Sequence, residues 1–217
     1  MCNFFFFRFC TRRCSSIAVA LALCAVTGWC SRGYAAEPDS VRIIRDIVYA
    51  TGYVVAPDGT PGTKALAMDV YLPATSATAP QPALLLVHGG GFAEGSKEQM
   101  EGLGRFFANR GFVCFANNYR LRRDIPDATP RAAVADTMAA VRWIRRHATE
   151  YGARPEAIGA LGYSAGAFAV LAVATASDSD FRVDGQTLAP FNTPGESSRV
   201  QAAVIVAGGL FSEDGLD

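Results

Sequence analysis

Ser164 is the residue whose type and surroundings point most directly to chemistry. It stands in the Gly-x-Ser-x-Gly pattern of residues 162–166, after an apolar run from Ile158 and before a run of helix-forming residues. Gly162 and Gly166 lack the Cβ atoms that would collide across a sharp strand-to-helix turn. The pattern therefore predicts that the Ser164 Oγ projects from the tip of that turn as a nucleophile.

The residues after Ser164 are expected to begin a helix. The first N–H groups of a helix have no acceptor within the helix, so they can stabilise a negative charge beside the serine. The alternative is a Gly/Ser/Ala-rich helix start without any chemical role, because so short a pattern also arises by chance. A second, independent motif is needed to choose between the two.

That second motif follows another predicted strand. Residues 82–87 read Pro-Ala-Leu-Leu-Leu-Val, a short apolar run typical of a parallel strand buried on both faces. His88 and three glycines follow directly, and glycines allow backbone N–H groups to point into a site. On its own the glycine run is equally compatible with a flexible loop. Two such motifs in this order, each after a buried strand, favour one shared catalytic edge.

Together the motifs resemble the α/β-hydrolase fold and, more narrowly, the carboxylesterases with a His-Gly-Gly-Gly oxyanion loop. The sequence is most similar to the acetyl-xylan/feruloyl esterase-like group, near the hormone-sensitive-lipase-like esterases. The likeness extends over about residues 41–210. Further segments that carry it are Asp69-Val70-Tyr71-Leu72-Pro73, Gly95-Ser96-Lys97, Asn118-Tyr119-Arg120-Leu121 and Ala140-Val141-Arg142-Trp143-Ile144.

The resemblance implies that Ser164 attacks an ester carbonyl and forms an acyl-enzyme. It also implies that the N–H groups of Gly90, Gly91 and Ala165 bind the resulting oxyanion. The implied substrates are short-chain acyl esters, including acetyl or feruloyl groups on a polysaccharide, so the expected partner is a small ester or an acylated carbohydrate. The residues expected to support the two motifs, with His88 shaping the loop instead of acting as the base, are His88, Gly89, Gly162 and Gly166.

The general base is expected late in the chain, because the family order is Ser, then Asp or Glu, then His. The chain has two histidines, His88 and His147, and both precede Ser164. His147 lies on the polar side of a predicted helix, which favours a solvated surface residue. Asp214 and Asp217 follow the last predicted strand, but no histidine follows them. We therefore expect a chain that is C-terminally truncated relative to an active parent and is itself an inactive fragment.

Two other hypotheses compete with the esterase. One is a non-catalytic relative of the same fold that binds an ester or a partner. The other is a peptidase of the same fold, which the fold by itself does not distinguish from an esterase. The His-Gly-Gly-Gly sequence and the small size favour the esterase over the peptidase. A downstream strand ending in Asp, followed by a loop with His, would favour the enzyme over the binding protein.

The elements that must position these residues alternate along the chain. This alternation predicts an α/β-hydrolase fold, with a mostly parallel sheet flanked by helices and its last strands missing. The first helix is expected to begin at Ser96 with a capping box to Gln99 and to end at Gly111. The other predicted helices are residues 131–151 and the one after Ser164. The predicted strands are residues 41–55, 64–72, 82–87, 112–116, 158–163 and 200–206, the last of them buried.

The amino end is predicted to be a targeting segment. Arg8, Arg12 and Arg13 precede an apolar run at residues 17–26, and small residues near Ala35 offer a cleavage site. We expect residues 1–36 to be a secretory signal peptide and residues 37–217 the hydrolase domain. The protein is then secreted or periplasmic, with no stable membrane insertion after cleavage. The alternative is an uncleaved anchor, but the apolar run is too short for a comfortable transmembrane helix.

Composition excludes several other classes of function. The formal net charge is +0, which gives no electrostatic basis for binding nucleic acid. Of the 6 cysteines, all but Cys114 lie in the predicted signal peptide, so no internal disulfide is expected in the mature chain. Two distant histidines and one remaining cysteine form no metal-ligand cluster. No metal ion and no cofactor are therefore expected.

Overall fold

Two kinds of strand pairing build the central sheet of this protein. The computed structural model describes residues 41–74, 79–125, 129–176, 182–183, 186–187 and 195–207. The strand order is β1-β2-β4-β3-β5-β8, with β1–β2 and β2–β4 antiparallel and the remaining pairs parallel. The strands are β1 Arg42–Val55, β2 Pro61–Leu72, β3 Gln81–Val87, β4 Val113–Asn117, β5 Ala153–Tyr163 and β8 Ala202–Val206.

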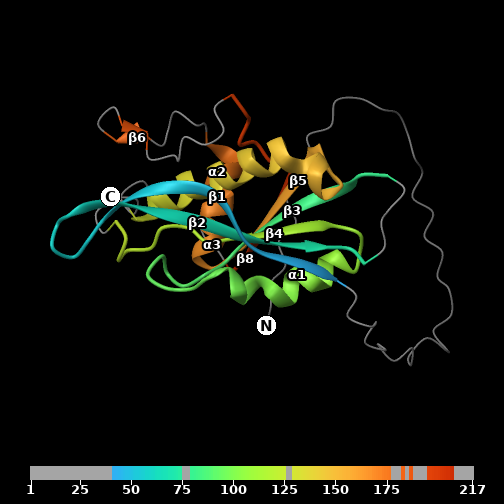
Figure 1. Cartoon of the computed structure of the whole chain (residues 1–217), viewed down its shortest axis with the longest axis horizontal. Helices are drawn as coiled ribbons and strands as arrows, with labels where there is room; N and C mark the ends of the chain where they lie inside the picture. The colour runs from blue at the N-terminus through green and yellow to red at the C-terminus, as the bar shows by residue number, and fades with distance from the viewer. Residues whose placement is uncertain are drawn as a thin grey trace, which may run out of the picture. The chain divides into compact units, whose positions relative to one another are not determined.

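Helices cover both faces of this sheet (Figure 1). One face carries α1, and the other carries α2 and α3. The helical segments are η1 Lys97–Met100, α1 Glu101–Ala108, α2 Thr129–His147, η3 Ala148–Tyr151 and α3 Ala165–Thr175. A separate two-stranded hairpin consists of β6 Arg182–Val183 and β7 Gln186–Thr187. The predicted mostly parallel sheet with flanking helices is confirmed, whereas the predicted signal peptide lies outside the described residues.

The sequence of β3 explains its central place. Successive side chains of a strand point to opposite faces, so a strand covered on both sides must be apolar throughout. Leu85 and Val87 pack into the cluster formed with α2 and α3, while Leu84 and Leu86 pack into the cluster formed with α1. Burying each such side chain contributes roughly 1.5–3 kcal/mol. The loop that begins at His88 therefore leaves a strand anchored on both faces.

The first helix begins differently from the prediction. Residues 97–100 form a 3-10 turn, and the Ser96 side chain makes no capping hydrogen bond. The Gln99 N–H donates instead to the backbone carbonyl of Ser96 at 3.1 Å, so the predicted capping box is wrong. The α-helix ends at Ala108, and Gly111, with φ of 86°, turns the chain toward β4.

Strand β5 begins five residues earlier than predicted, and it contains Pro155. Gln81 of β3 pairs with Ala153, and the register shifts before Ala83 pairs with Ile158. A proline cannot donate to a ladder, and this irregular part of the strand accommodates it.

The strand predicted to be buried at residues 200–206 is β8, and it is exposed along its whole length. Val204, Ile205 and Val206 are 47%, 37% and 39% exposed. An apolar run predicts a strand but does not specify its place in the sheet order. Here β8 pairs with β5 on one side, and within the described part of the chain no strand pairs with its other side. No helix in that described part is long and apolar enough to cross a membrane.

Candidate active site

The backbone at Ser164 is strained in the way a nucleophile elbow requires. Ser164 lies between β5 and α3 with φ of 51° and ψ of −118°, a region that side-chain-bearing residues rarely adopt. Its N–H donates to the carbonyl of Val206 at 2.9 Å, and its carbonyl accepts from Ala167 N–H at 2.9 Å. The turn is thus held from the neighbouring strand and from the helix that follows.

Two glycines make this turn possible. A Cβ atom at Gly162 would collide with the backbone of Gly166, and one at Gly166 would collide with the carbonyls of Val87 and His88. The helix start therefore rests directly on the end of β3. A Cβ atom at Gly89 would lie 3.1 Å from the Cβ of Ser164, so the glycine loop starts beside the serine.

The loop after β3 is a tight turn with unusual backbone angles. The N–H groups of Ala93 and Glu94 both donate to the Gly90 carbonyl, at 3.0 and 3.1 Å. Gly90, Gly91 and Phe92 have φ of 111°, 58° and 59°. A Cβ atom at Gly90 would collide with Glu94, so a side chain there would open the turn. Glycine is needed for both angle and space at this position.

His88 is enclosed beneath this loop. It is 1% exposed, and its ring stacks on Tyr119 with centroids 4.2 Å apart. Its Nδ1 lies 2.7 Å from the Gly89 carbonyl and donates to it, because a carbonyl oxygen only accepts. Burial lowers the pKa of His88 and outweighs the opposing effects of this hydrogen bond and of Glu98. The ring is therefore a neutral, structural part of the loop in this arrangement.

The predicted oxyanion donors belong to the two turns that follow β3 and β5. Gly91 is exposed, Gly90 is half-buried, and Ala165 is the first residue of α3, where a helix leaves N–H groups without an internal acceptor. Among the described residues, none accepts a hydrogen bond from the N–H of Gly90, Gly91 or Ala165. The turns after β3 and β5 thus each contain backbone N–H groups that no described residue accepts from.

Neither histidine reaches the Ser164 hydroxyl. His147 lies at the end of α2, stacked on Trp143 at 4.3 Å, with its Nδ1 2.8 Å from Glu150. Strand β5 begins shortly after this helix end and stops one residue before Ser164, so His147 and Ser164 lie at opposite ends of the strand. Within the described residues, no side chain is hydrogen-bonded to Ser164. Asp214 and Asp217, the two acidic residues considered for the late acid, lie outside the described residues.

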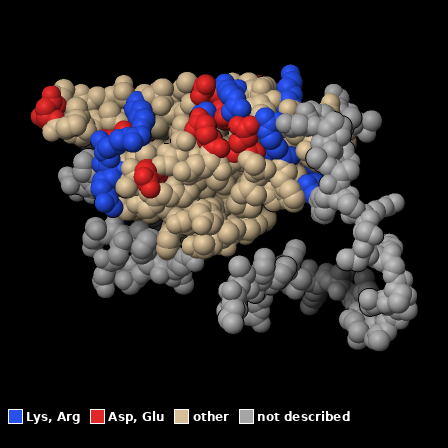
Figure 2. Space-filling view, turned by 90° about the horizontal axis from the view of Figure 1, so that it is seen from below, with Lys and Arg blue, Asp and Glu red and all other residues tan. Residues whose placement is uncertain are grey.

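A cleft of about 510 Å³ opens beside the elbow. Its lining is mostly apolar and includes no charged residue: Gly89, Gly90, Gln99, Met100, Leu103, Leu161, Tyr163 and Val206. Figure 2, which looks onto the α1 side, shows charged side chains gathered in groups around a broad area without Lys, Arg, Asp or Glu. An uncharged substrate group fits such a lining. In the part of the chain that the structure describes, His, Cys, Asp and Glu side chains form no cluster able to hold a metal ion.

Three side chains near the loop were not assigned a role from the sequence. Tyr119 donates its hydroxyl proton to the His88 carbonyl at 3.0 Å, and Asn118 accepts from the Lys97 N–H at 2.8 Å. Lys97 is itself buried beneath the start of α1. All three belong to segments that carry the family resemblance. The sequence, however, gives no signal that residues after β4 lie against the loop after β3.

Comparison with known proteins identifies relatives of this chain. Residues 68–210 match the family model BD-FAE. The "Probable carboxylic ester hydrolase LipM" of Mycobacterium tuberculosis (strain ATCC 25618 / H37Rv) is 33% identical over 129 residues, covering 58% of this chain and 27% of that protein. The "Probable isoprenylcysteine alpha-carbonyl methylesterase ICMEL1" of Arabidopsis thaliana is 32% identical over 100 residues, covering 46% of this chain and 20% of that protein. The matched part thus spans at most 27% of these relatives.

Solved structures agree with this result. The butyrate-bound esterase Est2 of Thermogutta terrifontis is 30% identical, with a TM-score of 0.60 over 79% of this chain and 56% of that chain. The same esterase phosphonylated by cyclosarin is 28% identical, with a TM-score of 0.59 over 79% of this chain and 59% of that chain. The fold is therefore the α/β-hydrolase fold of the carboxylesterases, and this chain spans a little over half of those structures.

Proposed function

The chain belongs to the BD-FAE family, and from this premise we propose that it acts as a serine carboxylic ester hydrolase on short-chain acyl esters. The observation that carries the proposal is the strained Ser164 turn, which lies so near the glycine loop that a Cβ atom at Gly89 would be 3.1 Å from the Cβ of Ser164. Strain of this kind persists only where the surroundings enforce it, and it is typical of sites where geometry serves chemistry.

In the proposed reaction, the Ser164 Oγ attacks the ester carbonyl, and the carbonyl oxygen becomes an oxyanion. The N–H groups of Gly90, Gly91 and Ala165 stabilise this charge, and loss of one such donor typically raises the barrier by roughly 3–4 kcal/mol. The proton of the Ser164 hydroxyl passes through water to the leaving alkoxy oxygen, which departs as an alcohol and leaves an acyl-enzyme on Ser164. Water then hydrolyses the acyl-enzyme, which releases the carboxylic acid and restores the serine hydroxyl. These donors are backbone groups, so the conformation of the loop determines how well they stabilise the oxyanion.

The cleft supports a small, uncharged substrate group. Its mostly apolar lining, with the Gln99 side chain as a polar group, suits an acyl chain of a few carbons. The Est2 structure with bound butyrate supports the same substrate size. Acetyl or feruloyl esters on a polysaccharide are the finer form of this proposal. We also propose that the protein is secreted or periplasmic. Mass spectrometry of the exported protein should then show a mature chain that begins near Ala36 or Glu37.

The placement of the two histidines bears on the rate. A serine hydroxyl is a weak nucleophile without a base, and His88 and His147 are both engaged elsewhere. We therefore propose that this chain alone turns over esters slowly. Oxyanion stabilisation and binding without a complete triad give about 10³–10⁴-fold acceleration over water.

The test is hydrolysis of p-nitrophenyl acetate and p-nitrophenyl butyrate by the full chain beside Ser164→Ala. The expected result is slow release of p-nitrophenolate that the variant abolishes, with circular dichroism showing the same fold in both proteins. Equal release by the two proteins would overturn Ser164 as the nucleophile. A rate typical of a complete esterase would show instead that one of the two histidines acts as base.

A further inference from the structure

The two ends of the glycine loop are held by two consecutive residues that follow β4. At the near end, the Tyr119 hydroxyl donates to the carbonyl of His88 at 3.0 Å. At the far end, the side-chain oxygen of Asn118 accepts from the backbone N–H of Lys97 at 2.8 Å. The loop of residues 88–96 is therefore closed between two adjacent side chains of another segment.

We propose that Lys97 and Asn118 are positioning residues for the reaction. They fix the far end of the loop of residues 88–96, and so they aim the N–H groups of Gly90 and Gly91 at the oxyanion. This inference rests on the proposed ester hydrolysis at Ser164. It adds two residues that touch neither substrate nor serine.

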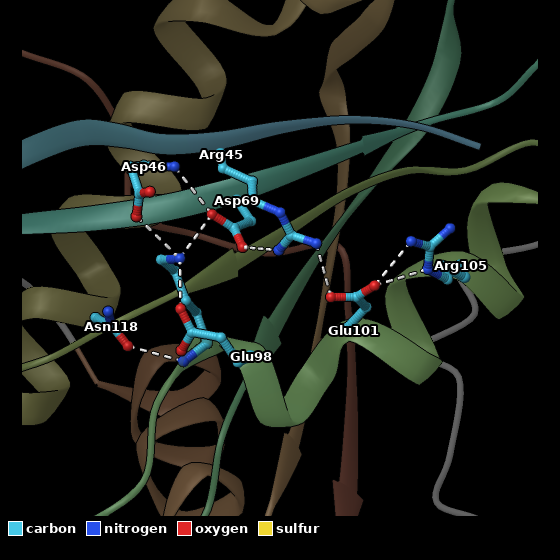
Figure 3. Close-up of polar contacts among 8 residues, drawn as sticks. Arg45, Asp46, Asp69, Glu98, Glu101, Arg105 and Asn118 are labelled. Atoms are coloured by element: carbon cyan, nitrogen blue, oxygen red, sulfur yellow. Dashed lines mark hydrogen bonds and ion pairs between the residues drawn. The ribbon is translucent and has the colours of Figure 1, made fainter.

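The Lys97 ammonium is the centre of the anchor. Its side chain is 3% exposed and lies 2.8 Å from Asp69, whose side chain is fully buried, 3.0 Å from Asp46 and 2.7 Å from Glu98. Figure 3 shows these carboxylates converging from β1, β2 and the turn before α1. A buried cation whose partners lie on two strands has few alternative positions. Moving away from these partners would leave a buried charge unpaired, which is costly.

Lys97 stays protonated and its carboxylate partner Glu98 stays ionised. Burial on its own lowers the pKa of Lys97, but hydrogen bonds to Asp69, Glu98 and Asp46 together raise it above its ordinary value. Hydrogen bonds from Lys97 and Ser96 lower the pKa of Glu98 to about 2. The ion pairs therefore persist across the pH range in which an esterase would be assayed.

Asn118 is itself fixed to the sheet. Its N–H donates to the carbonyl of Ala67 on β2 at 2.9 Å, and its carbonyl accepts from the Tyr49 hydroxyl at 2.6 Å. The loop end thus takes its position from β1 and β2 instead of from its own sequence. A displacement of about 1 Å from a productive geometry can lower a rate by about 10²-fold.

The outer part of the same network provides a matched control. Arg45 bridges Asp69 at 3.0 Å and Glu101 at 2.9 Å, and Arg105 pairs with Glu101 at 2.8 Å. Arg45 and Arg105 are partly exposed, so water screens these pairs. Arg105 lies on α1, and the Lys97 and Asn118 contacts described above do not involve it. Arg105→Met removes a charge from the network and leaves the loop anchors in place.

The experiment compares Lys97→Met, Asn118→Ala, Asn118→Asp and Arg105→Met with the unaltered full chain. The first readout is hydrogen exchange by mass spectrometry in peptides from residues 88–96, with peptides from α2 as the internal reference. The second is the rate of p-nitrophenolate release, separated into kcat and KM.

Lys97→Met and Asn118→Ala should speed exchange in the loop at least tenfold while α2 stays protected. Both should lower kcat by roughly 10- to 100-fold with KM changed less than threefold, because only the transition state carries the oxyanion. Asn118→Asp keeps an acceptor oxygen and should recover most of the loss, and Arg105→Met should match the unaltered chain.

Unchanged loop exchange in both variants overturns the inference, as does faster loop exchange with unchanged kcat. If Lys97→Met also speeds hydrogen exchange in α2, that variant has lost its fold. The test then rests on Asn118→Ala, which leaves every ion pair in place. Failure of the proposed function looks different. Ser164→Ala would then release p-nitrophenolate as fast as the unaltered chain, and loop exchange alone would confirm or overturn the anchoring.

Discussion

The elbow and the glycine loop meet at Ser164, but they are held in place by different means. The elbow is shaped by contacts within a few residues and with the strand beside it, where Gly162 and Gly166 allow backbone to touch backbone. The loop is shaped by side chains from other segments, chiefly Tyr119 at the near end and Asn118 at the far end. One half of the site is set by local sterics, and the other by tertiary hydrogen bonds.

This difference predicts two kinds of response to mutation. Backbone atoms in contact cannot move apart without separating β3 from α3, so a change in the elbow should have a large effect. Hydrogen bonds to a loop can be lost one at a time, so changes there should be graded. The predictions below run from the largest expected effect to the smallest.

Gly166→Ala should be the most damaging of these substitutions. Its Cβ would meet the carbonyls of Val87 and His88, which are backbone atoms that cannot rotate away. We expect the free energy of unfolding to fall by roughly 3 kcal/mol, at the upper end of overpacking effects. Gly91→Ala is the control, because its Cβ meets nothing within 4 Å and only its φ of 58° costs stability, about 1 kcal/mol. Urea denaturation measures both, and equal losses would contradict the comparison.

Tyr119→Phe should have a moderate effect. The substitution keeps the ring stacked on His88 but removes the hydroxyl that donates to the His88 carbonyl. Loss of a donor to a buried acceptor lowers the free energy of unfolding by about 1–3 kcal/mol. Tyr53→Phe, at an exposed position, should stay within about 0.5 kcal/mol of the unaltered chain. Similar values for both variants in urea denaturation would argue against a clamp at the near end of the loop.

His88 should make stability depend on pH. Burial lowers its folded-state pKa from the value of 6.5, so the unfolded chain binds a proton more readily. The free energy of unfolding should therefore fall as pH drops from about 6.5 toward the lower folded pKa, by at most about 1.4 kcal/mol per pH unit. In His88→Gln this part of the pH dependence should disappear. Urea denaturation at a series of pH values between about 4 and 8 gives the free energy of unfolding as a function of pH. The same dependence in both proteins would refute a buried neutral ring.

His147→Gln should have the smallest effect. The ring is partly exposed and pairs with the exposed Glu150 three residues on. Surface changes of this kind usually alter stability by less than about 0.5 kcal/mol. The release of p-nitrophenolate should also be unchanged, because β5 separates this residue from Ser164. A tenfold slower release in a folded variant would identify His147 as the base.

The elbow was predictable from sequence because its cause is local. Gly162, Ser164 and Gly166 are close in the chain, and a Cβ atom at Gly162 would collide with Gly166 inside the same short segment. The space that Gly166 itself needs is set by the end of β3, which the pattern alone does not show. The buried strand at residues 81–87 was predicted from its own run of apolar residues, which is typical of a strand covered on both faces. The exposure of β8 was not, because the same kind of run does not specify a strand's neighbours.

The residues that hold the loop in place could not be predicted from the sequence either. Asp69 lies on β2, Lys97 after the loop and Asn118 after β4, and only the folded sheet brings them together. Their types gave no warning, because Asp, Lys and Asn are ordinary surface residues in most sequences. Burial is what makes this group informative, and burial is a property of the fold.

The central claim is that Ser164 is a nucleophile that faces the donors of the glycine loop. Its most direct test is incubation of the full chain with a p-nitrophenyl alkylphosphonate. In this reaction the Ser164 Oγ forms a bond to phosphorus, p-nitrophenolate leaves and the hydroxyl proton passes to water. Intact mass followed by peptide mapping should show one adduct, on Ser164, and none in Ser164→Ala. An adduct on a different residue, or no adduct after prolonged incubation of the folded chain, would contradict the claim.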